Sequence, residues 1–158
     1  MARGSYSAVL DSTLISIPKI LVQIQAPSSA VLEIERAWVT KGFLQAGEPQ
    51  IDQMERLAIV RQDVAGSGTS ISPAPLDPDT PASDVTATLD ITTGSSISEY
   101  VYKGAADIAA GWLFVPQRGE SLIVPPSGIL GLYLGTFGGA LRESPVIVVA
   151  GLTWRELG

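Results

Sequence analysis

The stretch VPPSGILGLYL, Val124–Leu134, decides how the fold of this chain is interpreted. Two consecutive prolines hold the backbone extended, and Ser127 and Gly128 supply a tight turn directly before an apolar run. No helix signal or lysine follows, which excludes a phosphate-binding loop, and the run is far shorter than the roughly 20 apolar residues of a membrane-spanning helix. Both alternating sets of side chains after Gly128 are largely apolar, as is typical of a strand buried on both faces. We therefore expect a strand within a sandwich, its second face covered by another copy of the chain.

The composition indicates one acidic, β-rich domain over residues 1–158. Hydrophobic residues make up 46% and charged residues 16% of the chain, against a usual charged share of about 25%. Aromatic residues are only 6%, so most apolar side chains are aliphatic, a mixture that favours strands. So little surface charge suggests burial in an assembly. The net charge of −6 argues against binding to nucleic-acid phosphates, and we expect no nucleic-acid partner.

Two residue types are missing, because the chain contains neither cysteine nor histidine. Disulfides, thiolate nucleophiles and the usual zinc and iron–sulfur sites are thereby excluded, as are the commonest general base and metal ligand. The opening MARGSYSAVLDST reaches Asp11 before any sustained apolar core develops, so we expect no signal peptide. We expect a soluble protein with no cofactor, no metal and no membrane partner.

Hydrophobic residues recur mainly with a period of two, the spacing of half-buried strands. In VLEIERAWV, Leu32, Ile34 and Trp38 share the inward face, with Glu33 and Glu35 opposite and Arg36 the odd member of the inward set. The segment DVTATLDIT predicts a second inward set, which consists of Val85, Ala87, Leu89 and Ile91. Turn residues separate about eight to ten such strands, and we expect an antiparallel β-sandwich of jelly-roll type. Residues 63–84, rich in Ser, Pro, Asp and Gly, predict one long loop, and residues 1–7 a flexible N-terminal arm.

Three polar motifs invite a chemical role, and each has a simpler interpretation. The segment AGSGTS, Ala65–Ser70, looks like a phosphate loop, but prolines rather than a helix follow it and it has no lysine. Asp77, Asp79 and Asp84 could hold a cation, although Asp-Pro pairs are common turn devices. Ser16 and Lys19 have the S-x-x-K spacing, but Pro18 lies between them and an extended chain points them to opposite faces. We expect a flexible loop, turns and a chance spacing.

Two further groups are interpreted in the same way. Glu33 and Glu35 lie roughly 7 Å apart along one strand face, whereas a glycosidase pair flanks the sugar from opposite sides. We expect the two glutamates to be solvated or to pair with arginines. The three tryptophans could form a sugar-binding platform, but in a small sandwich large aromatic residues are more often core or interface anchors; they are Trp38, Trp112 and Trp154.

Five stretches, taken together, resemble small virion proteins of tailed bacteriophages of the head-decoration, or capsid cement, type. They are MARGSYSAVLDST, EIERAWVTKG, LDPDTPASD, VPPSGILGLYL and AGLTWREL, at residues 1–13, 33–42, 76–84, 124–134 and 150–157. The resemblance spans nearly the whole chain and rests on strand and turn motifs, not on a catalytic signature. It implies a β-sandwich that oligomerises, often as a trimer, on the outer face of a capsid and clamps neighbouring capsid subunits. It implies no catalytic residues.

The expected function is therefore that of a non-enzymatic structural protein, made in the host cytoplasm and located on the outer surface of the virion. Its expected partners are copies of itself and the major capsid protein, contacted through residues 1–7 and 63–84. An acidic surface suits the outside of a DNA-filled shell. The alternative is a carbohydrate- or receptor-binding virion module of a fibre or tail. That alternative requires some of the three tryptophans to be exposed side by side.

Overall fold

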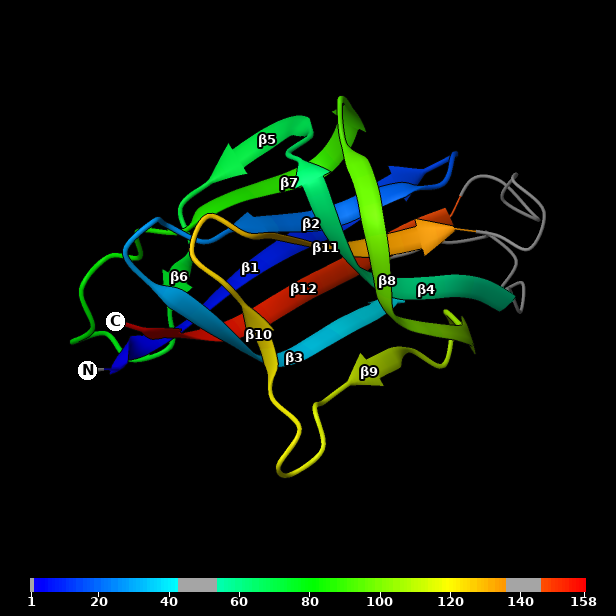
Figure 1. The fold of residues 1–158 in the computed structure, drawn as a ribbon. Coiled ribbons are helices and arrows are strands. Elements are labelled where there is room, and N and C mark those ends of the chain that lie inside the picture. Colours follow the sequence, from blue (N-terminus) through cyan, green and yellow to red (C-terminus); the bar gives the residue numbers. More distant parts are fainter. Residues whose placement is uncertain (1, 43–53, 136–145) are drawn as a thin grey trace.

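The computed structural model of the protein describes residues 2–42, 54–135 and 146–158, which form two antiparallel β-sheets and no helix (Figure 1). Sheet A contains, in spatial order, β10 (Leu122–Val124), β3 (Val31–Lys41), β12 (Val146–Leu157), β1 (Ala2–Ile15) and β6 (Ala74–Pro75), with β9 (Trp112–Phe114) also paired to β3. Sheet B contains β5 (Ser67–Ile71), β7 (Thr86–Thr93), β2 (Lys19–Gln25), β11 (Ile129–Gly135), β4 (Met54–Val64) and β8 (Ser96–Asp107). The two sheets are consistent with the expected β-sandwich.

The space between the sheets is filled by aliphatic side chains and, among the described residues, by two fully buried aromatic residues. Leu130, Leu132 and Leu134 of β11 are fully buried there, and burying one leucine contributes about 1.5–3 kcal/mol. Tyr6 and Trp154 are also fully buried, with ring centroids 6.5 Å apart. Trp154 is therefore a core residue, one of the two roles expected for the tryptophans.

The second face of β11 is covered by side chains of the same chain. Gln62 of β4 and Gln23 of β2 meet beside Gly131, where Nε2 of Gln62 donates to Oε1 of Gln23 at 2.9 Å. A Cβ atom at position 131 would lie 2.8 Å from Oε1 of Gln62, so glycine leaves the room that the amide needs. Tyr133 packs against a small cluster on this face, formed by Ile20, Ala58, Val60 and Ile91. The strand is thus covered on both faces as predicted, and the described side chains that cover its second face belong to the same chain. A second copy on this face stays a prediction.

A β-bulge in β3 reverses the alternation predicted for that strand. The pairing with β12 shifts register at Glu35, so that Glu35 and Arg36 both point outward. After the extra residue, Ala37 and Val39 are buried in the core and Trp38 lies on the outer face of sheet A. The prediction that Trp38 points inward is therefore wrong.

A second break lies in β7, where Asp90 has a backbone φ of 51°. Left-handed backbone is uncommon for residues other than glycine, and it turns the following side chain to the other face of the strand. Leu89 packs in the main core, whereas Ile91 joins the cluster on the outer face of sheet B. The predicted inward set therefore ends at Leu89. Lys19 of β2 forms an ion pair with the Asp90 carboxylate.

The predicted flexible arm, residues 1–7, is wrong for the residues that the structure describes. Strand β1 begins at Ala2 and pairs with β12 along its length. Tyr6, Ala8 and Leu10 are buried between the sheets, and the hydroxyl of Tyr6 donates to the carbonyl oxygen of Pro81 at 2.8 Å. A period-two apolar pattern therefore already begins at Tyr6 and holds this end of the chain in the sheet.

The predicted long loop, residues 63–84, is largely ordered by strand pairing. Strand β4 extends to Val64, β5 pairs with β7, and β6 pairs with β1. These short strands raise the number among the described residues to twelve, above the eight to ten expected. What remains irregular is residues 76–84, named the Asp-Pro loop below. Its first residue, Leu76, donates its N–H to the carbonyl oxygen of Ser5 at 2.9 Å.

The contact between Trp38 and Gly151 predicts a coupled effect on stability. A Cβ atom at position 151 would lie 2.1 Å from Cζ2 of Trp38, so Gly151→Ala must displace the indole ring that packs on Gly151. We expect Gly151→Ala to lower the free energy of unfolding by about 1–3 kcal/mol. In a Trp38→Ala background the same change should cost much less, as urea denaturation of the four proteins would measure. An equal cost in both backgrounds would contradict this packing.

Candidate interaction surfaces

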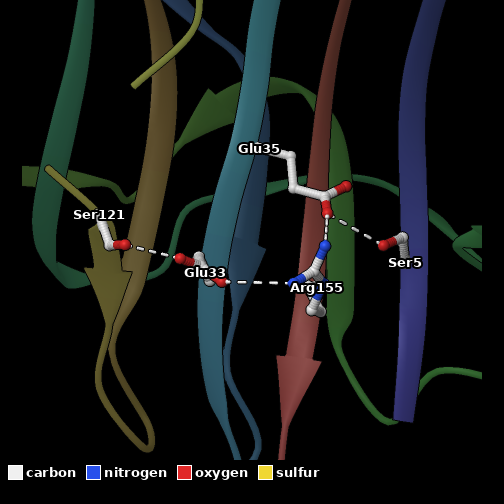
Figure 2. A network of polar contacts seen from close by, with 5 residues as sticks. All are labelled: Ser5, Glu33, Glu35, Ser121 and Arg155. Atoms are coloured by element: carbon white, nitrogen blue, oxygen red, sulfur yellow. Dashed lines mark hydrogen bonds and ion pairs between the residues drawn. The ribbon is translucent and has the colours of Figure 1, made fainter. Parts of the chain in front are cut away.

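A polar network crosses the outer face of sheet A (Figure 2). Arg155 of β12 lies between Glu33 and Glu35 of β3, with Nη2 3.0 Å from Oε1 of Glu35 and Nη1 3.9 Å from Oε2 of Glu33. The hydroxyl of Ser5 donates to Oε1 of Glu35 at 3.1 Å, and that of Ser121 donates to Oε1 of Glu33 at 2.6 Å. One arginine and two hydroxyls therefore engage both carboxylates, and the network joins β1, β12, β3 and the segment before β10.

This geometry confirms the pairing of the two glutamates with an arginine. Figure 2 shows both carboxylates turning from β3 toward the same guanidinium. They do not face each other across a space that a sugar could occupy. Alternation along β3 places Glu35 on the same outer face as Glu33, and Arg155 of the neighbouring β12 lies within reach of both carboxylates. The network holds three strands of the sheet in register on its solvent side.

The other polar motifs of the sequence are structural where the chain is described. No helical turn joins Ser16 to Lys19, and Lys19 pairs with Asp90 instead. The segment 65–70 forms an irregular link after β4 and most of β5, and no helix follows it. In the Asp-Pro loop, Oδ1 of Asp77 accepts the N–H of Asp79 at 3.0 Å, as expected for turn chemistry. Within the described ranges no three acidic residues, Asp84 included, are grouped so that they could hold a metal ion.

The three tryptophans are separated, not aligned. Trp154 lies in the core, and Trp38 lies on the outer face of sheet A beneath the guanidinium of Arg36, 5.1 Å from the ring centroid. Trp112 of β9 pairs with Val39, so it points to the inner side of sheet A. Its ring packs beside Phe114, with centroids 6.3 Å apart. No two tryptophans form an exposed platform.

One side of the sandwich is closed by aromatic contacts between β8 of sheet B and β9 of sheet A. The ring of Tyr102 lies 4.9 Å from that of Phe114 and 6.0 Å from that of Trp112. Around this contact large apolar side chains remain in solvent, with Leu113 64% and Val115 55% exposed. They surround a pocket of about 440 Å³. We call this surface the edge patch, which consists of Val101, Tyr102, Leu113 and Val115.

A different surface lies on the outer face of sheet B, over β4, β8 and β11. Tyr100 is flanked by two cations, with Nζ of Lys103 4.5 Å and Cζ of Arg56 5.6 Å from its ring centroid. Tyr133 meets Tyr100 edge to face at 6.2 Å. Burial raises the pKa of Tyr133 above its ordinary value and the neighbouring Tyr100 adds to the rise, while Arg56 opposes it. These four residues, Arg56, Tyr100, Lys103 and Tyr133, are called the cation–tyrosine patch.

Comparison of the chain with family models, with curated proteins and with solved structures gives no match. The described residues also contain no helix that could cross a membrane.

Sequence reasoning missed both surfaces, although a signal for each exists. The segment EYVYK places tyrosine on both sides of Val101, and WLFV has four apolar residues in succession, so apolar side chains occupy both faces of each strand. Such runs usually indicate burial. Among the described strands β8 is the last of sheet B and β9 pairs with β3 alone, so part of each run remains in solvent. An edge position depends on pairing between strands distant in sequence and cannot be read from local periodicity.

The network around Arg155 predicts a modest, specific loss of stability. We expect Arg155→Met to lower the free energy of unfolding by about 0.5–1 kcal/mol, because two exposed ion pairs are lost. The matched control is Arg118→Met, since Arg118 is exposed and forms no ion pair within the described residues. Urea denaturation should show the loss for Arg155 alone. An equal loss of unfolding free energy in both variants would show that the network does not stabilise the fold.

The raised pKa of Tyr133 predicts a loss of stability in alkali. Because the folded state favours the neutral phenol, this contribution is fully present below the ordinary pKa of 10.0 and is lost as the pH rises through the raised pKa. The free energy of unfolding should therefore fall more steeply above pH 10.0 in the wild type than in Tyr133→Phe. Denaturation curves over a series of alkaline buffers would measure both slopes. Identical slopes of unfolding free energy against pH in the two proteins would contradict a raised pKa of Tyr133.

Proposed function

We propose that this protein is a non-enzymatic structural virion protein that binds the outer surface of a bacteriophage capsid and clamps neighbouring capsid subunits. The observation that carries this proposal is the edge patch, where four large apolar side chains surround a pocket in solvent. Exposed apolar patches with polar rims mark protein–protein contacts. Gln117 and Glu120 supply polar groups at the wall of this pocket.

The strand order supports a jelly-roll form of the sandwich. Pairs join the first strand with the last and proceed inward: β1 with β12, β2 with β11, β3 with β9 and β10, and β4 with β8. A long hairpin rolled onto itself has this nested pairing, and it is how a jelly roll is built. Strands β5, β6 and β7 are then an insertion at the tip of that hairpin. The form is shared by viral capsid proteins and lectins, so it supports a class of folds and not one function.

The charge of the chain supports the proposed location outside the capsid, and mass action explains how binding would stabilise it. A net charge of −6 suits the outside of a shell packed with DNA. A protein that binds only the assembled lattice stabilises that lattice. The proposed partners are the major capsid protein and copies of this chain in a homo-oligomer, for which we propose a trimer.

A carbohydrate- or receptor-binding role receives less support. It requires tryptophans exposed side by side, whereas Trp154 is buried and Trp38 and Trp112 lie on opposite faces of sheet A. The aromatic residues near β9 pack on one another and on β8. We therefore propose the structural role alone.

Virions and a matched pair of leucine variants would test the proposal. Purified virions should contain the protein at a copy number comparable to the capsid lattice sites and release it on mild heating. Leu113→Asp in the edge patch should weaken binding to capsids lacking the protein by at least about tenfold, equal to about 1.4 kcal/mol. The control is Leu14→Asp, because Leu14 is exposed on a different strand and its change should leave binding intact.

Two results would count against the proposal. A copy number far below that of the lattice sites would indicate a tail or fibre role. Unchanged capsid binding by the Leu113 variant would exclude the edge patch as the capsid contact.

A further inference from the structure

In the cation–tyrosine patch Tyr100 and Lys103 are exposed, and Arg56 and Tyr133 are half-buried. Small residues surround its charged groups on the outer face of sheet B: Ala58 pairs with Lys103 across β4 and β8, and Arg56 lies between Gly135 and Ala105. Neither Arg56 nor Lys103 forms an ion pair with a carboxylate in the described part of the chain, where both lie close to the ring of Tyr100. In a chain of net charge −6, two adjacent cations without acidic partners are a site for an anionic group.

The Asp-Pro loop carries negative charges that are complementary to those of the patch. Asp77 and Asp79 are exposed, and neither pairs with a cation within residues 2–42, 54–135 and 146–158. The loop is held in one shape, because Thr80 donates its N–H to the carbonyl oxygen of Asp77 at 3.0 Å and Tyr6 anchors Pro81 at 2.8 Å. A loop that is already ordered loses little conformational entropy on binding.

The loop cannot reach the patch of its own chain. It is tied to β1, at the end of the sandwich where both chain termini lie, whereas β4 begins and β8 ends at the opposite end (Figure 1). We propose that the Asp-Pro loop of one copy binds the cation–tyrosine patch of a neighbouring copy, with Asp77 and Asp79 facing Arg56 and Lys103. Prolines of the loop then pack on the exposed ring of Tyr100.

This contact joins two different surfaces, so it is heterologous. Repeated by one rotation, a heterologous contact closes into a ring in which every loop and every patch is occupied. The inference rests on the homo-oligomer of the proposed function and specifies how its copies are joined. A three-membered ring leaves the edge patch of each copy available for the capsid.

Charge reversal with reciprocal rescue tests the contact. The loop variant is Asp77→Asn with Asp79→Lys, in which asparagine keeps the acceptor of the turn, and the patch variant is Arg56→Gln with Lys103→Glu. Sedimentation velocity should show a discrete wild-type oligomer at low salt, and at least tenfold weaker association for each variant. The variant that combines all four changes should associate again, since the reversed charges attract. Arg118→Glu, a cation outside the patch, is the control and should associate as the wild type does.

Salt and capsid binding complete the test. Association of the wild type should weaken at about 1 M salt, where the Debye length falls to about 3 Å. A monomeric wild type at low salt, undiminished association of the loop or patch variant, or failure of the combined variant to recover would each overturn the inference. Capsid binding is measured on the same proteins. If the variants are monomeric but still bind capsids, the proposed function stands. If the association results are as expected but the wild type does not bind capsids, the proposed function is refuted and the contact between copies is not.

Discussion

Strand β11 lies between β2 and β4 in sheet B, and neither of its faces can be left in water. Its inward leucines fill the core, while its outward positions carry Ile129, Gly131 and Tyr133. Glycine at the centre of that outward set lets Gln62 cross to Gln23, and the second amide also accepts the N–H of Gly66 at 2.8 Å. Burying these amides is tolerable because Nε2 of Gln62 and Oε1 of Gln23 are hydrogen-bonded, although Oε1 of Gln62 has no partner among the described residues. The same contacts hold the turn into β5 against the outer face, so that covering β11 also orders the insertion.

The character of the outer faces is decided by residues that interrupt the alternation. The bulge at Glu35 in β3 places Arg36 and Trp38 on the outer face of sheet A. The left-handed Asp90 sends Ile91 outward to pack near Tyr133 and places its own carboxylate on Lys19. In both cases one irregular residue changes which side chains of the strand face the core and which face outward. The outer surfaces of this sandwich are therefore determined by backbone irregularities as much as by the hydrophobic pattern.

Side-chain alternation is sufficient to predict an all-β sandwich and the full burial of β11. It also predicts that Glu33 and Glu35 share a face, because each strand residue adds the same rotation. It fails at Trp38 and Ile91, since a bulge or a positive φ shifts every residue that follows. It fails again at residues 1–7, where a single buried Tyr6 outweighs the polar composition around it. The apolar runs of the edge patch are visible in the sequence, but their exposure could not be predicted, because long-range strand pairing decides that β8 and β9 lie at edges.

The few charged residues of this chain are distributed unevenly, and that distribution separates two kinds of contact. Lys19, Arg61 and Arg155 are paired with carboxylates. Arg56 and Lys103 of the patch, and Asp77 and Asp79 of the loop, form no ion pair among the described residues and lie at opposite ends of the sandwich. A charged contact weakens with added salt because screening shortens its range. An apolar contact such as the edge patch is strengthened by salts that are excluded from protein surfaces. The proposed joining of copies and the proposed capsid binding therefore respond to salt in opposite directions, so one titration can separate the two surfaces in the assembled protein.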